Sequence, residues 1–264
     1  MTGSPRPSPT DNTSLDIRTE GAVAYLTISR PDKRNALNDR LIAAFDAFFA
    51  APPRGIRVVI LTGAEEHFSA GLDLAEHVSR SAADTLCHSR NWHRVMDAIQ
   101  YSGLPVISAM KGAVIGGGLE LATATHVRIA EPSCVFQLPE GRRGIFVGGG
   151  ASVRVGRILG ADRMLEMMLT GRKYGAEEGL ALGLAHYLVG AGEALAKAEE
   201  MAAVIAANAQ LSNYLMIHAL SRIEDMAKAD GLFTESLCAA LTQTSEDAAE
   251  GLSAFLERRA PNFG

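Results

Sequence analysis

Short strand-forming segments alternate with helices in the first two-thirds of the chain, and helix-forming sequence dominates the rest. Helical spacing of apolar residues predicts helices at 38–50 and 86–100, and Pro52 with Pro53 ends the first of them. From Ala161 onward Ala, Met and Leu are frequent, and we expect the apolar stripe at 164–168 to be buried. This order predicts an α/β core and a helical C-terminal region that serves assembly. The predicted strands lie at 23–29, 57–62, 105–110 and 127–130.

The composition indicates a globular protein with a sizeable core, since 47% of the residues are hydrophobic and 21% are charged. The 25 basic and 30 acidic side chains give a net charge of −5 without a basic block, so we expect neither nucleic acid nor a membrane surface as partner. The distant cysteines Cys87, Cys134 and Cys238 fit a reducing compartment, and we expect a cytoplasmic protein. Residues 1–14 are predicted to be a disordered tail, because Pro, Ser and Thr dominate there.

Two glycine clusters, at 116–118 and 148–150, are the most unusual local feature. Neither completes a dinucleotide-binding fingerprint, because Leu121 and Val153 occupy the third glycine position, and the phosphate-loop motif is absent. What remains is a glycine-rich turn before a helix that starts near Gly118. Such a turn either presents free main-chain amides to a ligand or is a tight turn with no ligand.

Two glutamates accompany these clusters. Glu120 stands between two leucines in the first turn of the predicted helix, and Glu140 precedes the second cluster. A carboxylate among apolar residues is costly to bury unless it is paired or protonated. Buried carboxylates of this kind are typical of sites for acid–base catalysis. The alternatives are an acid favoured by a helix N-terminus for Glu120, and a solvated loop residue paired with Arg142 or Arg143 for Glu140. No set of His and Cys residues has zinc spacing, so we expect no metal.

Three motifs follow one another in a characteristic order: FSAGLDL at 68–74, PVISAMKG at 105–112 and GGGLELA at 116–122. With further matches at 30–37, 136–140, 169–171 and 251–263, the chain from about 15 to 263 resembles the enoyl-CoA hydratase/isomerase (crotonase) superfamily, most closely its two-glutamate hydratases. The resemblance implies an α/β fold: a spiral of β-β-α repeats over 15–195, then a helical trimerisation region over 196–264. It also implies a homotrimer or a dimer of trimers.

The implied substrate is an acyl-CoA thioester, with no separate cofactor. The resemblance implies an oxyanion hole made by the main-chain amides of Leu72 and Gly117, and Glu120 and Glu140 as catalytic acids. The amide of Gly148 would hold the attacking water. Contacts to coenzyme A are implied for Ala70, Asp73, Leu74, Phe255 and Arg258, the last two from a helix that often belongs to a neighbouring subunit.

With both glutamate positions filled, the resemblance implies syn-addition of water to a trans-2-enoyl-CoA through a thioester enolate, which gives a 3-hydroxyacyl-CoA. An isomerase, a hydratase-lyase, a thioester hydrolase and a non-catalytic acyl-CoA-binding protein stay open as alternatives. The chain departs from the family pattern at Gln137, at Val147, at the pair Arg142 and Arg143, and at His126. The acyl preference is therefore left open, and we expect its lining residues in the stretch 76–92.

Overall fold

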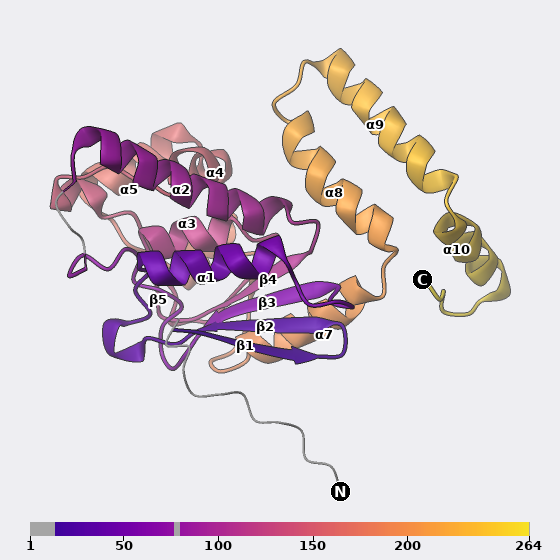
Figure 1. Cartoon of the computed structure of the whole chain (residues 1–264), viewed down its shortest axis with the longest axis horizontal. Coiled ribbons are helices and arrows are strands. Elements are labelled where there is room, and N and C mark those ends of the chain that lie inside the picture. Colours follow the sequence, from indigo (N-terminus) through magenta and orange to yellow (C-terminus); the bar gives the residue numbers. More distant parts are fainter. Residues whose placement is uncertain (1–13, 77–79, 264) are drawn as a thin grey trace, which may run out of the picture.

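The computed structural model describes residues 14–76 and 80–263 (Figure 1). The predicted disordered tail lies outside these residues, apart from Ser14. Within the described part of the chain, none of the helices is long and apolar enough to cross a membrane.

A six-stranded sheet in the order β1-β2-β3-β4-β6-β9 forms the centre of the molecule. The β1–β2 pair is antiparallel and the other neighbours are parallel. Every residue of β4 is buried, as expected for a parallel strand with both faces covered, and its apolar run explains why the sequence predicts it. The strands are β1 (Leu15–Glu20), β2 (Val23–Ile28), β3 (Val58–Gly63), β4 (Val106–Met110), β6 (Val127–Ala130) and β9 (Tyr187–Leu188).

A second, three-stranded sheet consists of β5 (Ala113–Ile115), β7 (Val135–Gln137) and β8 (Tyr174–Gly175). The chain passes from the large sheet to the small one twice in succession, from β4 to β5 and from β6 to β7. Parallel bridges join Leu37 to Leu72 and Ser69 to Val114, so earlier turns of the chain lie beside β5 in the same way. This coiling is the implied spiral, and the α/β fold class is confirmed.

Helices cover both faces of the large sheet (Figure 1). On one face α1 and α2 pack through apolar side chains, and α1 begins after Asn38, whose side chain accepts a hydrogen bond from the Leu41 amide at 3.0 Å. On the other face α7 packs its alanines Ala194, Ala198 and Ala202 against β3 and β4. These helices are α1 (Asp39–Ala50), α2 (Ala82–Tyr101) and α7 (Ala194–Ala206).

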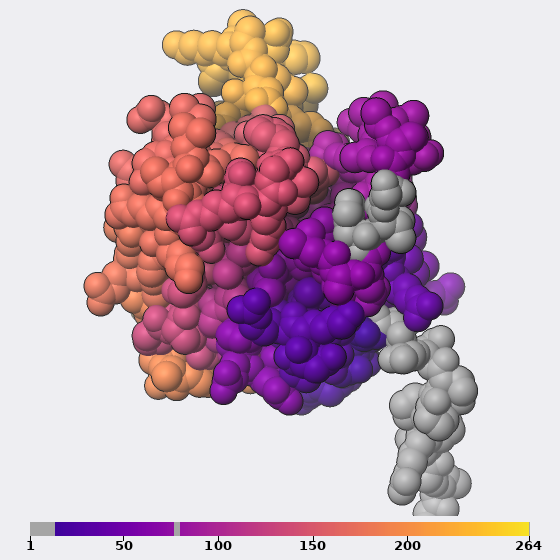
Figure 2. Space-filling model, turned by 90° about the vertical axis from the view of Figure 1, so that its left-hand side faces the viewer, coloured from indigo at the N-terminus to yellow at the C-terminus, as the bar shows by residue number. Residues whose placement is uncertain are grey.

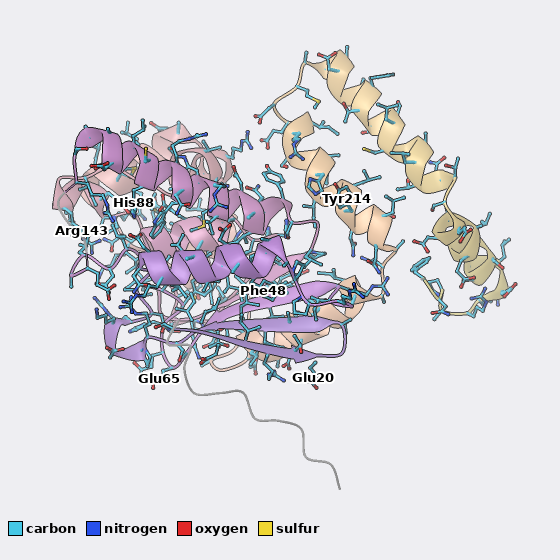
Figure 3. All side chains as sticks on the ribbon, in the orientation of Figure 1. Glu20, Phe48, Glu65, His88, Arg143 and Tyr214 are labelled. Carbon is cyan, nitrogen blue, oxygen red and sulfur yellow. The ribbon has the colours of Figure 1, made fainter. Side chains whose placement is uncertain are left out.

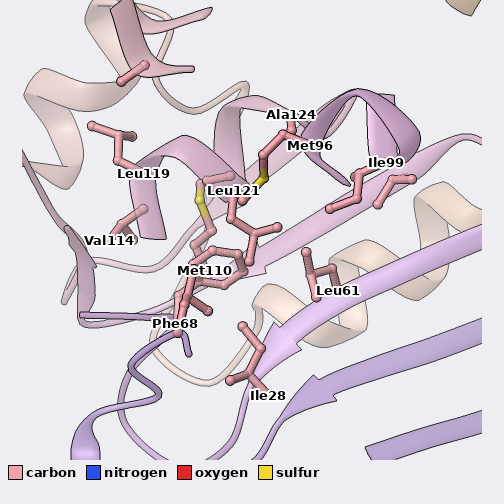
Figure 4. Close-up of a cluster of buried hydrophobic side chains, with 14 of the residues drawn as sticks. Ile28, Leu61, Phe68, Met96, Ile99, Met110, Val114, Leu119, Leu121 and Ala124 are labelled. Atoms are coloured by element: carbon pink, nitrogen blue, oxygen red, sulfur yellow. The ribbon is translucent and has the colours of Figure 1, made fainter. Parts of the chain in front are cut away.

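A short helix, α3 (Gly117–Thr123), is buried along its whole length. Figure 4 shows Leu121 close to Met96 of α2 and Leu119 on the other side of α3, near Val114 of β5; both leucines belong to the buried core. This packing fixes α3 at the place where the small sheet ends. The remaining elements before α7 are the 3₁₀ helices η1 (Pro31–Lys33) and η2 (Glu140–Arg143), with α4 (Ala151–Leu159), α5 (Ala161–Thr170) and α6 (Ala176–Ala181).

The stripe at 164–168 is only partly buried. Met164 and Met167 lie in the core, but 55% of Leu165 is exposed, so its predicted burial is wrong. Successive residues of a helix point about 100° apart, so Leu165 faces away from the core that Met164 joins.

The last three helices are α8 (Gln210–Ile223), α9 (Lys228–Gln243) and α10 (Glu246–Glu257), and they extend away from the sheets (Figure 1). They expose large apolar side chains, among them Leu220, Phe233, Leu241 and Phe255. Helices that expose this much apolar surface are typical of a protein interface. The assembly role predicted for this region stays a prediction.

Candidate active site

A pocket lies between α2, the N-terminus of α3 and the segment from η2 to Gly149. Figure 2 views the molecule from this end, and Figure 3 labels His88 and Arg143, which both line the pocket. The predicted site residues that line it are Leu72, Leu74, Gly117, Glu120, Glu140 and Gly148.

The main-chain amides of Leu72 and Gly117 lie side by side at the floor of this pocket. The bridge between Ser69 and Val114 aligns the two segments, and a Cβ atom built on Gly117 would lie 3.3 Å from the Leu72 nitrogen. Gly71 has φ +87° and a Cβ there would lie 2.9 Å from the Gly117 nitrogen, so only glycine fits. Within the described residues, neither amide donates to another residue. The pair can therefore bind one oxyanion.

Glu120 projects from α3 into the pocket and is almost fully buried. Its Oε1 accepts hydrogen bonds from the Gly149 amide at 2.8 Å and the Ala151 amide at 3.1 Å. Burial raises the pKa of Glu120, while these amides and the charge of Arg154 oppose the rise. The amides thus stabilise the ionised carboxylate in a site that otherwise disfavours charge.

Glu140 begins η2 and is also buried, with 6% of its surface exposed. Its Oε2 has no hydrogen-bond partner among the residues that the structure describes, and a Cβ on Gly116 would lie 2.8 Å from its Oε1. Burial raises the pKa of Glu140 to about 7, the charge of Glu120 adds to the rise, and Arg143 opposes it. The alternative of a solvated loop glutamate paired with arginine is wrong, because Glu140 is buried and Arg142 donates instead to the Thr170 carbonyl at 2.6 Å.

Four residues of α2 line the pocket without having been predicted individually: Thr85, His88, Ser89 and Trp92. They lie in the stretch 76–92 where lining residues were expected, and their spacing of three, one and three puts them on one face of the helix. That periodicity could have identified them from the sequence. Ser89 also donates a hydrogen bond from Oγ to the Gly148 carbonyl at 2.7 Å.

A sequence model of the family described as enoyl-CoA hydratase/isomerase matches residues 18–264. The chain belongs to the enoyl-CoA hydratase/isomerase family. Its relatives include the enoyl-CoA hydratase EchA19 of Mycobacterium tuberculosis, which is 32% identical over 94% of this chain and 95% of its own. The 2,3-dehydroadipyl-CoA hydratase of Escherichia coli is 32% identical over 94% and 98% of the two chains.

Solved crotonase structures have the same fold. A Rhodopseudomonas palustris protein that is assigned as an enoyl-CoA hydratase is 48% identical, with a TM-score of 0.92 over 96% of this chain and 98% of its own. An enoyl-CoA hydratase from Bacillus anthracis is 30% identical, with a TM-score of 0.89 over 95% and 98% of the two chains. The recognition of a crotonase from its motifs is thereby confirmed.

The residues expected to contact coenzyme A are not all at the pocket. Leu74 lines it, whereas the Ala70 amide donates to the Arg34 carbonyl at 2.9 Å. The Asp73 carboxylate is buried in ion pairs with Arg30 at 2.8 Å and Lys33 at 2.9 Å. Burial alone would raise the pKa of Asp73, but the hydrogen bonds from Lys33 and Arg30 outweigh it and lower this pKa to about 2.

Phe255 lies in the last turn of α10 and Arg258 follows this helix, which Figure 1 shows far from α3, whose N-terminus borders the pocket. Both are exposed, and neither reaches the pocket of its own chain. A role in binding coenzyme A therefore requires a neighbouring copy of the chain, and it stays a prediction.

The departures from the family pattern divide into two groups. Val147 and Arg143 line the pocket, so they can affect which ligand the pocket accepts. Gln137 instead donates to the Gly171 carbonyl at 2.6 Å, and His126 accepts from the Val106 amide at 2.9 Å, so both are structural. Among the described residues no cluster of His, Cys, Asp and Glu could hold a metal ion.

Proposed function

We propose that this protein is an enoyl-CoA hydratase, which adds water syn to a trans-2-enoyl-CoA and gives a 3-hydroxyacyl-CoA. One observation carries the proposal: two buried carboxylates, Glu120 and Glu140, line the same pocket as the unpaired amides of Leu72 and Gly117. The hydratase names of the relatives support it. The reaction needs only amides, carboxylates and water, and coenzyme A enters as part of the substrate.

The amide pair stabilises the charge that develops during addition. As water adds to the β-carbon, electrons move to the thioester oxygen and an enolate forms. The amides of Leu72 and Gly117 donate to this oxygen, an effect commonly worth about 3–4 kcal/mol for each donor. Gly117 is the first residue of α3, so the helix dipole also favours the negative oxygen.

The two carboxylates divide the proton transfers. Glu120 is stabilised as an anion by two amides, so it takes a proton from water, whose oxygen bonds to the β-carbon. Burial raises the pKa of Glu140 to about 7, so a protonated fraction is present at neutral pH, and this form delivers its proton to the α-carbon. The proton that Glu120 gains passes to solvent, and Glu140 takes one back from solvent before the next turnover. The Gly148 amide, which also faces Glu120, helps to hold the water.

The substitutions Glu120→Gln and Glu140→Gln test these roles. Each should lower turnover at least ~100-fold in an assay that follows the absorbance of the conjugated enoyl thioester. Glu200→Gln is the matched control, because Glu200 is an exposed residue of α7 that pairs with Lys197. Near-normal rates in both active-site variants refute the roles, and failure to turn over any enoyl-CoA in a panel of chain lengths refutes the function.

An isomerase is the second candidate, because Glu140 with its free Oε2 could move a proton between two carbons on its own. Mass analysis of the product distinguishes the reactions, since hydration adds one water, isomerisation adds nothing and a lyase step splits the acyl chain. Binding of an acyl-CoA without turnover would instead indicate a non-catalytic binding protein.

We further propose that the chain forms a homotrimer or a dimer of trimers through α8, α9 and α10. The exposed apolar side chains of these helices, such as Phe233 with 66% of its surface exposed, support this assembly. Light scattering coupled to gel filtration measures the mass in solution, and a monomer would refute the proposal.

A further inference from the structure

We propose that Ser89 is a positioning residue that fixes the peptide between Gly148 and Gly149 and, through it, the carboxylate of Glu120. The inference rests on the proposed hydratase function and adds a residue that does not itself exchange a proton with the substrate. It concerns how the base of the reaction is kept ionised and in place.

One peptide unit joins the serine to the glutamate. Its carbonyl, that of Gly148, accepts the hydrogen bond from Ser89 Oγ at 2.7 Å. Its amide, that of Gly149, donates to Glu120 Oε1 at 2.8 Å. In a planar trans peptide the C=O and N–H bonds point in opposite directions, so the serine and the glutamate hold opposite edges of one rigid plane. The two hydrogen bonds polarise this peptide in the same sense and strengthen each other.

This peptide needs an external hold because glycines stand on both of its sides. Without Cβ atoms, rotation of the plane meets little steric resistance. A larger residue at position 149 could not restrict this rotation, because its Cβ would lie 2.9 Å from the Glu120 carboxyl carbon. In the described part of the chain, the carbonyl of Gly149 accepts only a long hydrogen bond of 3.4 Å from Arg154. Ser89 therefore provides the short contact that orients the amide.

The charged and titratable groups around Glu120 come from three elements. Glu140 faces it from η2, and Arg154 faces it from α4. On α2, Asp97 pairs with Arg154, and His93 places Nε2 3.5 Å from Ser89 Oγ. Burial lowers the pKa of His93 and the charges of Arg90 and Arg154 lower it further, which favours the neutral ring. Removing the uncharged hydroxyl of Ser89 leaves all these charges in place.

The expected consequence has a definite sign. A hydrogen bond to the ionised carboxylate lowers the pKa of Glu120, so loosening the Gly149 amide raises it. The base must be ionised to accept a proton from water. The acid limb of the pH–rate profile should therefore move to higher pH when the hydroxyl is lost, and activity should fall most at low pH.

Ser89→Ala removes the hydroxyl, and Ser89→Thr keeps it. For Ser89→Ala we expect kcat at pH 7 to fall about 3- to 10-fold with a smaller change in KM, the loss of one neutral hydrogen bond. Carbon-13 NMR of the glutamate carboxyls, assigned with Glu120→Gln, should show the pKa of Glu120 raised by about half a unit. Ser89→Thr should restore both values.

Thr85→Val is the matched control for the NMR titration. It removes a hydroxyl from the same face of α2, but this hydroxyl donates to the Ser81 carbonyl at 2.9 Å, so the pKa of Glu120 should keep its wild-type value. An unchanged pKa and pH profile in Ser89→Ala, or equal losses in the Ala and Thr variants, overturns the proposal. If the wild type hydrates no enoyl-CoA, the proposed function fails, while the carboxyl titration still decides the role of Ser89.

Discussion

Replacing Gly149 by alanine should displace Glu120 and abolish most of the activity. The new Cβ would lie 2.9 Å from the Glu120 carboxyl carbon, still closer to Oε2, and 3.3 Å from Cε3 of Trp92. The buried carboxylate would have to retreat by roughly 0.5–1 Å, and a misplacement of about 1 Å costs on the order of 100-fold in rate. We therefore expect a fall in kcat of about that size, with a smaller effect on KM because the amide pair is untouched.

The neighbouring glycine provides the comparison. A Cβ on Gly148 would lie 3.7 Å from its nearest neighbour, Ser89 Oγ, which is an ordinary contact, so Gly148→Ala should lose much less activity than Gly149→Ala. The loss of enoyl-thioester absorbance measures the rates, and thermal melting separates misplacement from unfolding. Equal losses in the two folded variants, or a wild-type rate for Gly149→Ala, would refute the steric reasoning.

Three further predictions concern charge. Burial raises the pKa of Glu140 to about 7, so ionising this carboxyl costs the folded protein stability as the pH rises from about 4.5 through 7. Glu140→Gln cannot ionise, so its melting temperature should rise relative to that of the wild type over this range. A constant difference between the two melting temperatures contradicts this. Arg143→Leu removes a charge that opposes the rise, so the alkaline limb of kcat should move to higher pH, and an unmoved limb contradicts this. Asp73→Asn removes the buried carboxylate that pairs with Arg30 and leaves Glu76 as the acidic partner of this arginine in the described part of the chain, so denaturant unfolding should show a loss of about 3 kcal/mol, and a loss below about 1 kcal/mol contradicts it.

The sequence predicts the long and strongly apolar elements well. The strands β2, β3, β4 and β6 and the helices α1 and α2 lie close to their predicted ranges. Burial of both faces of a strand leaves a continuous apolar run in the sequence, and burial of one helix face leaves a clear periodicity. The small sheet was not predicted, because β5, β7 and β8 have only two or three residues each and are held by partners far along the chain. Such pairing leaves little trace in the local sequence.

The residues of the candidate site were chosen from the motifs rather than from local sequence patterns, and their roles stay predictions. From its local sequence alone, Glu120 is interpreted as an acid at a helix N-terminus and Glu140 as a loop residue. Both line one pocket only because the chain coils back on itself. For Asp73 the motif position implies a contact with coenzyme A, which stays a prediction, and the structure adds that its carboxylate pairs with Arg30 and Lys33. The role of Ser89 depends on one carbonyl 59 positions later, which no local pattern reveals.

The side-by-side arrangement of the Leu72 and Gly117 nitrogens has a consequence for how this catalyst tolerates mutation. Both donors belong to the polypeptide backbone of adjacent coils, so exchanging a side chain deletes neither of them, Pro excepted. Inserting or deleting a single residue near Ser69 or Val114 would shift one coil against the next and turn a donor away. Length changes in these two connections should thus be far more damaging than most point substitutions. Glu120 and Glu140 differ from the amides in this respect, because a single side-chain substitution removes either acid.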